Sequence, residues 1–141
     1  MSDAPSPADF NAAIIAEFRA NAGVVGGPFE GAPMVLLTTT GAKSGLPRTS
    51  PLVYQREDDR VFIFASKAGA PTHPDWYRNL TANPTVTVEI GDETYTATAV
   101  ELDREERDRV YAQQAAAMPG FADYQANTDR VIPVIELVRQ G

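Results

Sequence analysis

Runs of hydrophobic residues divide the chain into six short strands. Residues 34–40 are almost all apolar or β-branched, which is typical of a strand buried on both faces. Alternation of apolar and polar residues marks 85–90 and 94–102, and Gly91-Asp92 between them predicts a hairpin with one solvent-facing side. The other strands are predicted at 49–55, 60–65 and 131–138, with a hairpin turn at Glu57-Asp58-Asp59.

An amphipathic helix is predicted near the N-terminus. Phe10, Ile14 and Phe18 recur at spacing four, and Ser6-Pro7 before them is typical of a helix start. The polar side of this helix is not basic, which favours docking on the domain core over a membrane-surface or substrate-channel role. Weak membrane-surface association through residues 7–21 stays open as an alternative, and residues 1–8 are expected to be flexible.

Three further helices are expected between the strands. A short helix begins near Pro74, with Thr72 or His73 as its cap, and ends before Asn83-Pro84. The other two are predicted at 103–117, behind a capping-box-like start, and at 121–128, after the break at Pro119-Gly120.

The order of these elements favours a small barrel. The strands are mostly joined by hairpins, and the helix between the third and fourth strands is short for a parallel crossover. The predicted fold is therefore mainly β with peripheral helices (α+β), a closed or split β-barrel of about six strands. At 141 residues the chain is expected to form a single domain.

Composition narrows the function classes. The chain has no cysteine and one histidine, which argues against a disulfide framework, a zinc centre or a Ser-His-Asp triad, so no metal site is predicted. The formal net charge of −7 argues against nucleic acid as a partner, because a phosphate backbone needs a basic surface. No run of about 20 apolar residues and no signal-peptide pattern is found, so a cytoplasmic location is expected.

The positive charge is nevertheless placed unevenly. Only two lysines occur, Lys43 and Lys67, and each follows a predicted strand in a loop of small residues. An acidic protein that places both lysines in this way is expected to form one local basic pocket for an anionic small molecule.

The first of these loops carries the strongest chemical signal. Gly41 and Gly45 bracket Lys43 and Ser44, and Arg48 follows, which gives a high density of backbone and side-chain donors. The spacing matches neither a P-loop nor a dinucleotide-binding fingerprint. An anion site and a hairpin with ordinary surface charges therefore both stay open on these residues alone.

The second loop, 66–69, resembles the first, because it also follows a strand and places small residues around a lysine and a glycine. It is expected at the same end of the barrel if the strands before the two loops are neighbours. Trp76 follows on the short helix and either packs against a flat ligand ring or anchors the core. His73, beside Pro74, is interpreted as a capping or surface residue and not as a catalytic base.

Four ordered motifs resemble those of the deazaflavin-dependent nitroreductase family, and the similarity covers nearly the whole chain. They are Thr39-Thr40-Gly41-Ala42-Lys43-Ser44-Gly45-x-Pro47-Arg48, then Pro51-Leu52, then Ala65-Ser66-Lys67-Ala68-Gly69, then His73-Pro74-x-Trp76-Tyr77-x-Asn79-Leu80-x-Ala82-Asn83-Pro84. The resemblance implies a split β-barrel that binds reduced coenzyme F420, a deazaflavin with a phosphate and a polyglutamate tail. It implies hydride transfer to an electron-poor small-molecule acceptor such as a quinone, enone or nitro compound.

The resemblance also implies the cofactor-binding residues. Lys43, Ser44 and Arg48, with the backbone amides near Ala42 and Gly45, would hold the phosphate and the nearby tail. Thr49, Ser50 and Pro51 would continue along the ribityl chain. The ring would lie against Ala65, Ser66, Lys67 and Ala68, mostly through backbone donors, with the Asp75 backbone and Trp76 on its other side.

Ser66 and Tyr124 are the expected catalytic residues, which would hydrogen-bond a polar acceptor atom and stabilise developing negative charge. The type member of the family activates nitroimidazole prodrugs and has tyrosines over its substrate pocket. This chain has Val53, Met118 and Phe121 at those positions, so reduction of such prodrugs is not predicted.

Two other functions stay open, an FMN-dependent split-barrel oxidoreductase and a protein that carries F420 or a fatty acid without turnover. A homodimer is also considered, because an apolar barrel edge is expected to pair.

Overall fold

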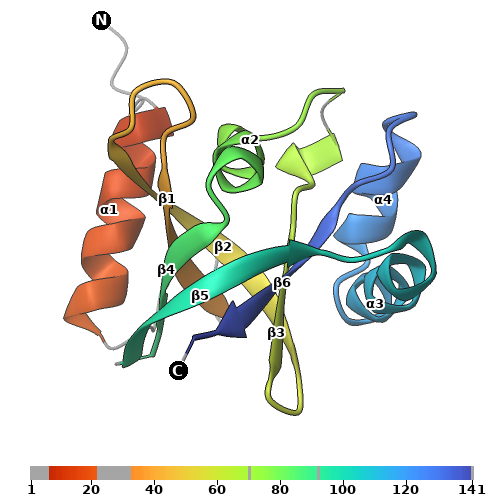
Figure 1. Cartoon of the computed structure of the whole chain (residues 1–141). Coiled ribbons are helices and arrows are strands. Elements are labelled where there is room, and N and C mark those ends of the chain that lie inside the picture. Colours follow the sequence, from red (N-terminus) through yellow and green to blue (C-terminus); the bar gives the residue numbers. More distant parts are fainter. Residues whose placement is uncertain (1–6, 22–32, 70, 92, 141) are drawn as a thin grey trace, which may run out of the picture.

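The computed structural model describes residues 7–21, 33–69, 71–91 and 93–140, and within them six strands form a closed barrel (Figure 1). Around the barrel the strands follow the order β1-β2-β3-β6-β5-β4, and all neighbours are antiparallel. Their bounds are β1 Met34–Thr40, β2 Pro47–Glu57, β3 Arg60–Phe64, β4 Thr85–Ile90, β5 Glu93–Glu101 and β6 Val134–Arg139. The predicted six-stranded barrel is confirmed. The expected apolar barrel edge is wrong, because each strand has a neighbour on both sides.

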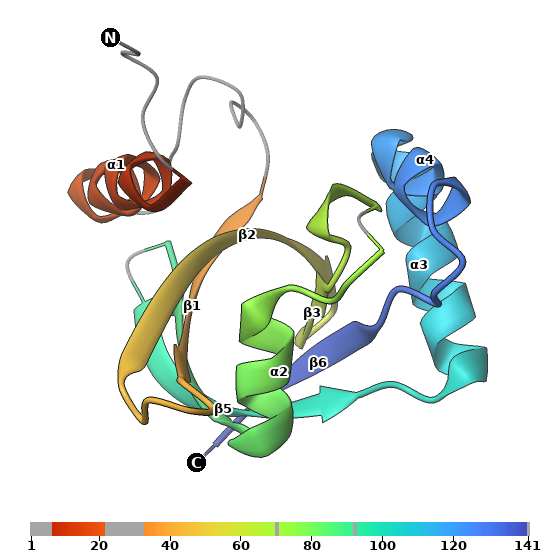
Figure 2. The same cartoon turned by 90° about the horizontal axis from the view of Figure 1, so that it is seen from above.

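The helices lie outside the barrel wall or across its end (Figures 1 and 2). Their bounds are α1 Pro7–Ala20, η2 Lys67–Gly69, α2 Asp75–Ala82, α3 Arg104–Ala117 and α4 Gly120–Ala126. The predicted helix start is confirmed at α3, where the Asp103 carboxylate accepts a hydrogen bond from the Glu106 amide at 3.0 Å, while the Glu106 carboxylate pairs with Arg60. The predicted Ser6 cap of α1 lies outside the described residues.

Three predicted boundaries are wrong. Neither Thr72 nor His73 caps α2, because its N-cap is Pro74, with no side-chain cap. β2 begins at Pro47 because the short turn after β1 lets pairing start at once, with Thr40 opposite Pro47. β6 begins at Val134 because Pro133 has no amide hydrogen for the ladder.

Alternation along β1 and β3 divides the core into three clusters. Val35, Leu37, Val61 and Ile63 point into the barrel, where Trp76 and Leu80 of α2 also pack. The opposite faces are also apolar: Phe62 and Phe64 pack under α3 and α4, while Met34 and Leu36 pack under α1. Continuous hydrophobic runs in β1 and β3 therefore reflect strands covered on both faces.

Helix α1 is docked on the outer wall of the barrel. Ile14 and Phe18 are buried against Met34 and Leu36, and Arg19 donates to the Glu89 carboxylate at 2.8 Å. The docked interpretation of this helix is confirmed for its described side chains. In the described residues, no helix has the length and apolar character needed to span a membrane.

We expect Phe18→Ala to lower the free energy of unfolding by about 3 to 5 kcal/mol, because it removes a buried aromatic ring. Urea denaturation followed by circular dichroism measures the loss. Val138→Ala is the control, because that side chain is 43% exposed, and we expect it to cost less than about 1 kcal/mol. Equal losses in the two variants would contradict docking of α1 on the barrel.

Candidate functional site

Both lysine loops lie at the same end of the barrel. β1 and β3 run in the same direction because each is antiparallel to β2 between them, so the loop 41–46 and the η2 turn leave the barrel together. Helix α2 crosses this end (Figure 2). The expectation that the two loops share one end is confirmed.

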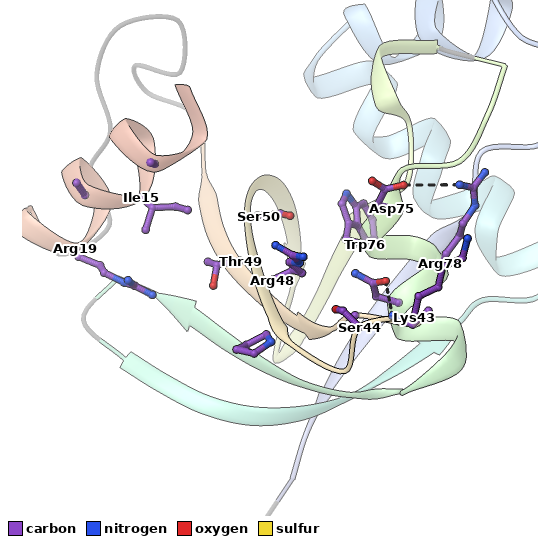
Figure 3. A pocket seen from close by; sticks show the side chains of 16 residues that line it. Ile15, Arg19, Lys43, Ser44, Arg48, Thr49, Ser50, Asp75, Trp76 and Arg78 are labelled. Carbon is purple, nitrogen blue, oxygen red and sulfur yellow. Dashed lines mark hydrogen bonds and ion pairs between the residues drawn. The ribbon is translucent and has the colours of Figure 1, made fainter. Parts of the chain in front are cut away.

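An open pocket of about 1090 Å³ lies between α1, the 41–50 segment and α2 (Figure 3). Four of its lining residues are cationic, and Asp75 is its one acidic residue. The Asp75 carboxylate lies 3.7 Å from the Arg78 guanidinium. The lining residues are Ala12, Ile15, Ala16, Arg19, Gly41, Ala42, Lys43, Ser44, Pro47, Arg48, Thr49, Ser50, Asp75, Trp76, Arg78 and Asn79.

Lys43 and Arg48 are the two cations of this pocket without a carboxylate partner. Across the described part of the chain, neither side chain forms an ion pair, whereas Arg19 pairs with Glu89 and Arg78 with Asp75. In a chain with seven excess negative charges, two unpaired cations on one exposed loop favour binding of an anion. Their flexible side chains suit a phosphate or carboxylate group.

The loop 41–46 has a fixed backbone shape. Gly41 donates to the Leu46 carbonyl at 2.8 Å, and Gly45 donates back to the Gly41 carbonyl at 2.9 Å. Gly45 has φ of +71°, which favours glycine, and a Cβ atom at Gly41 would stand 2.4 Å from Ser44 Oγ. The backbone of this turn therefore favours glycine at position 45, and a side chain at position 41 would displace the Ser44 hydroxyl.

Asn79 joins this loop to α2. Its side-chain Oδ1 accepts from the Ala42 amide at 3.0 Å, and its Nδ2 donates to Oγ1 of the buried Thr39 at 3.2 Å. The Ala42 and Gly45 amides, which were expected to face a phosphate, are thus donors to protein oxygens in this structure. The side chains of Lys43 and Ser44 on the loop, and of Arg48 at the start of β2, are then the candidate donors to an anion.

The outer face of β2 continues from the loop. Thr49, Pro51 and Val53 point outward because they pair with the outward residues of β1, and Thr49 Oγ1 lies 2.8 Å from Thr38 Oγ1. Ser50 points to the inside of the barrel mouth. Val53 packs against the cluster under α1 and also against the cluster under α3 and α4. The half-exposed outer face of β2 therefore lies between α1 on one side and the α3–α4 pair on the other.

The η2 turn packs directly on α4 at Tyr124. Gly69 has φ of +80°, and a Cβ atom there would stand 2.7 Å from the Tyr124 carbonyl oxygen. The predicted catalytic residues Ser66 and Tyr124 thus lie on elements in contact with each other. Lys67 is exposed and donates to Thr72 Oγ1 at 3.2 Å, so its ammonium is not in the pocket that holds Lys43.

Tyr124 stands at the edge of an apolar cluster. Its ring contacts Phe121 at 5.2 Å between centroids, and Phe121 contacts Phe64 at 5.5 Å. Val53 and Met118 join the same cluster. Val53, Met118 and Phe121 therefore gather in one place from two separate parts of the chain, β2 and the α3–α4 connection.

The structure confirms Trp76 as a core residue and overturns the interpretation of His73. Trp76 is 8% exposed and packs with Ala65 in the barrel core, yet it also lines the pocket. His73 is neither a cap nor a plain surface residue, because its half-buried ring stacks on Tyr77 at 4.6 Å and its Nδ1 lies 3.1 Å from the Arg130 guanidinium. Burial, with help from Arg130 and Arg78, lowers the pKa of His73.

The pocket brings together eight predicted cofactor residues: Ala42, Lys43, Ser44, Arg48, Thr49, Ser50, Asp75 and Trp76. Gly45, Pro51, Ala65, Ser66, Lys67, Ala68 and Tyr124 lie outside its lining. Sequence reasoning missed Arg78, Asn79 and the α1 wall, although Asn79 belongs to a motif that resembles the family. Within the described residues, no cluster of His, Asp and Glu side chains is suited to a metal ion.

The fold and the pocket define a small β-barrel protein with a largely cationic pocket at one end of the barrel. Residues 13–139 match the family model described as F420H(2)-dependent quinone reductase. The chain therefore belongs to the F420H(2)-dependent quinone reductase family, which confirms the predicted resemblance.

Individual relatives support this assignment. An F420H(2)-dependent quinone reductase of Mycobacterium tuberculosis is 39% identical over 127 residues, which cover 87% of this chain and 85% of the relative. A solved F420-H2 dependent reductase is 48% identical, with a TM-score of 0.68 over 74% of this chain and 93% of its own. A solved domain-swapped dimer is 40% identical, with a TM-score of 0.70 over 94% of this chain and 99% of its own.

We expect Asn79→Ala to loosen the 41–46 loop, because it leaves the Ala42 amide and the buried Thr39 hydroxyl without their partner. Hydrogen exchange should show faster exchange of the Ala42 amide, together with a stability loss of about 1 to 3 kcal/mol. Thr81→Ala on the same helix is the control, because Thr81 bonds only to its own helix at the Tyr77 carbonyl. Unchanged exchange at Ala42 would contradict the role of Asn79.

Proposed function

We propose that this chain reduces a quinone by hydride transfer from reduced coenzyme F420, held across the end of the barrel that carries both lysine loops. The observation that carries the proposal concerns two cations of an acidic protein, Lys43 on the 41–46 loop and Arg48 just after it. In the described residues, neither side chain forms an ion pair with a carboxylate. Family membership supports the cofactor and the acceptor class.

The residues of the site fit such a cofactor. A phosphate needs cations and hydroxyl donors, which Lys43, Arg48 and Ser44 supply at the exposed end of the pocket. The outer face of β2 at Thr49 and Pro51, with Ser50 at the barrel mouth, then offers a half-exposed path for the ribityl chain. Trp76 supplies a flat apolar surface at the pocket wall.

The ring is assigned to the turn after β3. The backbone of Ala65, Ser66, Lys67 and Ala68 would supply its hydrogen-bond donors, with Trp76 and the Asp75 backbone on the other side. Bound F420 supplies the hydride, and the protein supplies binding, orientation and electrostatics.

The acceptor is assigned to the region of α4. Val53, Met118 and Phe121 would offer an apolar surface to a flat quinone ring, and the Tyr124 ring packs against Phe121 at that surface. Ser66 and Tyr124 would donate hydrogen bonds to a quinone oxygen and stabilise the charge that develops there. A proton for the product would come from Tyr124 or from water.

We expect the protein to bind F420 at micromolar affinity or better, and Lys43→Ala/Arg48→Ala to weaken binding by about 100-fold, because two charge-assisted contacts are lost. Fluorescence titration of F420 measures both affinities. The matched control removes the charge of Arg104, which pairs with Asp108 on α3 and lies outside the pocket. An unchanged affinity in the double variant would remove the phosphate assignment, and no binding by the native chain would remove the cofactor.

We expect Tyr124→Phe to lower kcat for quinone reduction by about 10- to 100-fold while F420 affinity stays within about twofold, because one donor to the reacting oxygen is lost. Steady-state oxidation of F420H2 with a quinone series measures kcat and KM. Tyr95→Phe is the control, because Tyr95 packs in the barrel core with Arg139 over its ring. A fall in F420 affinity with kcat unchanged would contradict an acceptor-side role.

The same assays separate the open alternatives. A yellow purified protein with a flavin absorption band would favour FMN, and F420 binding without acceptor-dependent oxidation would favour a carrier. We keep the cytoplasmic location as a proposal. A homodimer is also proposed, supported by the domain-swapped dimer among the similar structures.

A further inference from the structure

Arg130 holds the turn that the proposed function assigns to the deazaflavin ring. Its Nη1 donates to the Ala65 carbonyl at 3.0 Å, and its Nη2 donates to the Ser66 carbonyl at 2.7 Å. The planar guanidinium fork thus spans two successive carbonyl groups, which a lysine ammonium cannot reproduce. These two hydrogen bonds join residues that lie 65 and 64 positions apart in the chain.

This contact fixes the direction of backbone donors. A trans peptide group places its amide hydrogen opposite its carbonyl oxygen. Because the Ala65 and Ser66 carbonyls face Arg130, the amide hydrogens of Ser66 and Lys67 point to the opposite side of the turn. These are two of the backbone donors that the proposed function assigns to the ring.

The turn needs such a contact from outside. Lys67 has φ of 46°, which is costly for a residue other than glycine and persists where surrounding structure holds it. The Ser66 carbonyl also accepts from the Gly69 amide at 2.9 Å, so it is bound from both sides. The local sequence alone therefore does not fix this geometry.

Arg130 itself is firmly placed. Its carbonyl accepts from Gln125 Nε2 of α4 at 2.7 Å, and its amide donates to Thr128 Oγ1 at 3.3 Å. The Gln125 Oε1 atom accepts from the Ile132 amide at 3.0 Å. The helix that carries Tyr124 thus also anchors the residue that holds the opposite turn.

His73 completes the arrangement. Its Nδ1 lies 3.1 Å from Arg130 Nη1, and since arginine only donates, Nδ1 accepts and the neutral ring carries its hydrogen on Nε2. The ring is stacked on Tyr77, whose hydroxyl donates to Glu101. The charged groups that act on His73 are Arg130, Arg78 of α2 and Glu101 of β5.

We propose that Arg130 is a positioning residue that orients the Ser66 and Lys67 amides for the cofactor ring, and that neutral His73 keeps its guanidinium in place. The proposal rests on the proposed function for the identity of the ligand, but the amide orientation is a property of the chain itself. Protonation of His73 replaces the acceptor at Nδ1 with a donor that faces Arg130 and adds a like charge.

The direction of the pH effect follows from the environment of His73. Burial and the neighbouring arginines lower its pKa from its ordinary value. The contact is therefore intact above the pKa of the unfolded chain, near 6.5, and is lost as pH falls through the lower pKa of the folded state. The orientation of the turn is expected to change over the same pH range.

The test uses Arg130→Lys, which keeps the charge but loses the fork, and His73→Gln, which keeps a neutral acceptor that does not titrate. Nuclear magnetic resonance of the ligand-free protein follows the Ser66 and Lys67 amide signals, together with the His73 ring signals, from about pH 8 down through the titration of His73 itself. We expect both signals to titrate with His73 in the native chain, to move in Arg130→Lys, and to be independent of pH in His73→Gln.

A binding measurement accompanies the amide signals. We expect Arg130→Lys to weaken F420 binding by about 10- to 100-fold, and we expect the affinity of His73→Gln not to fall at low pH as that of the native chain does. Arg104→Lys, at an exposed pair on α3, is the matched control and leaves both readouts unchanged.

Distinct results overturn the inference and the proposed function. Amide signals that stay fixed in Arg130→Lys, or a native pH profile shared by His73→Gln, would overturn the role of Arg130. Failure of the native chain to bind F420 would overturn the proposed function, and the amide signals alone would then decide the orientation. If Arg130→Lys does not fold, His73→Gln decides.

Discussion

The position of the site depends on which strands have their outer face covered by a helix. β1 and β3 are apolar on both sides, so each needs a helical cover outside the barrel, which α1 gives to β1 and the α3–α4 pair gives to β3. β2 lies between them, and its outer face at Thr49, Pro51 and Val53 stays half exposed (Figure 2). A surface between two fixed walls is thus a direct consequence of burying two apolar strands.

Two polar side chains fix the loops at the two ends of that surface. Asn79 binds the 41–46 loop from α2, and Arg130 binds the η2 turn from the segment after α4. The Asn79 amide and the Arg130 guanidinium each offer two atoms for hydrogen bonds. Each contacts backbone groups of a loop whose conformation the local sequence does not fix. Since α2 rests in the barrel core through Trp76 and Leu80, the first loop is positioned by the same packing that closes the barrel.

Sequence patterns predicted what is local. The strand periods, the Asp103 cap and the tight Gly41–Gly45 turn depend on neighbours within a few residues, and the structure confirms them. Asn79 and Arg130 were missed as positioning residues because their partners lie 37 and about 65 residues away and leave no periodic signal. His73 was misinterpreted for the same reason: its ring is half buried by Tyr77 and Arg130, not exposed beside Pro74. The family resemblance supplied the ligand, which no pattern of polarity contains.

The distribution of ion pairs explains how an acidic protein presents a basic site. Away from the pocket, several arginines pair with carboxylates: Arg60 with Glu136 and Glu106, Arg109 with Glu57, and Arg139 with Glu93. The hydrogen bond from Arg109 lowers the pKa of Glu57, with smaller help from Gln113 and from the charge of Arg60. In the described residues, Lys43 on the 41–46 loop and Arg48 at the start of β2 form no ion pair, although the chain carries an excess of negative charge. This placement of charge supports the proposed preference for a small anion.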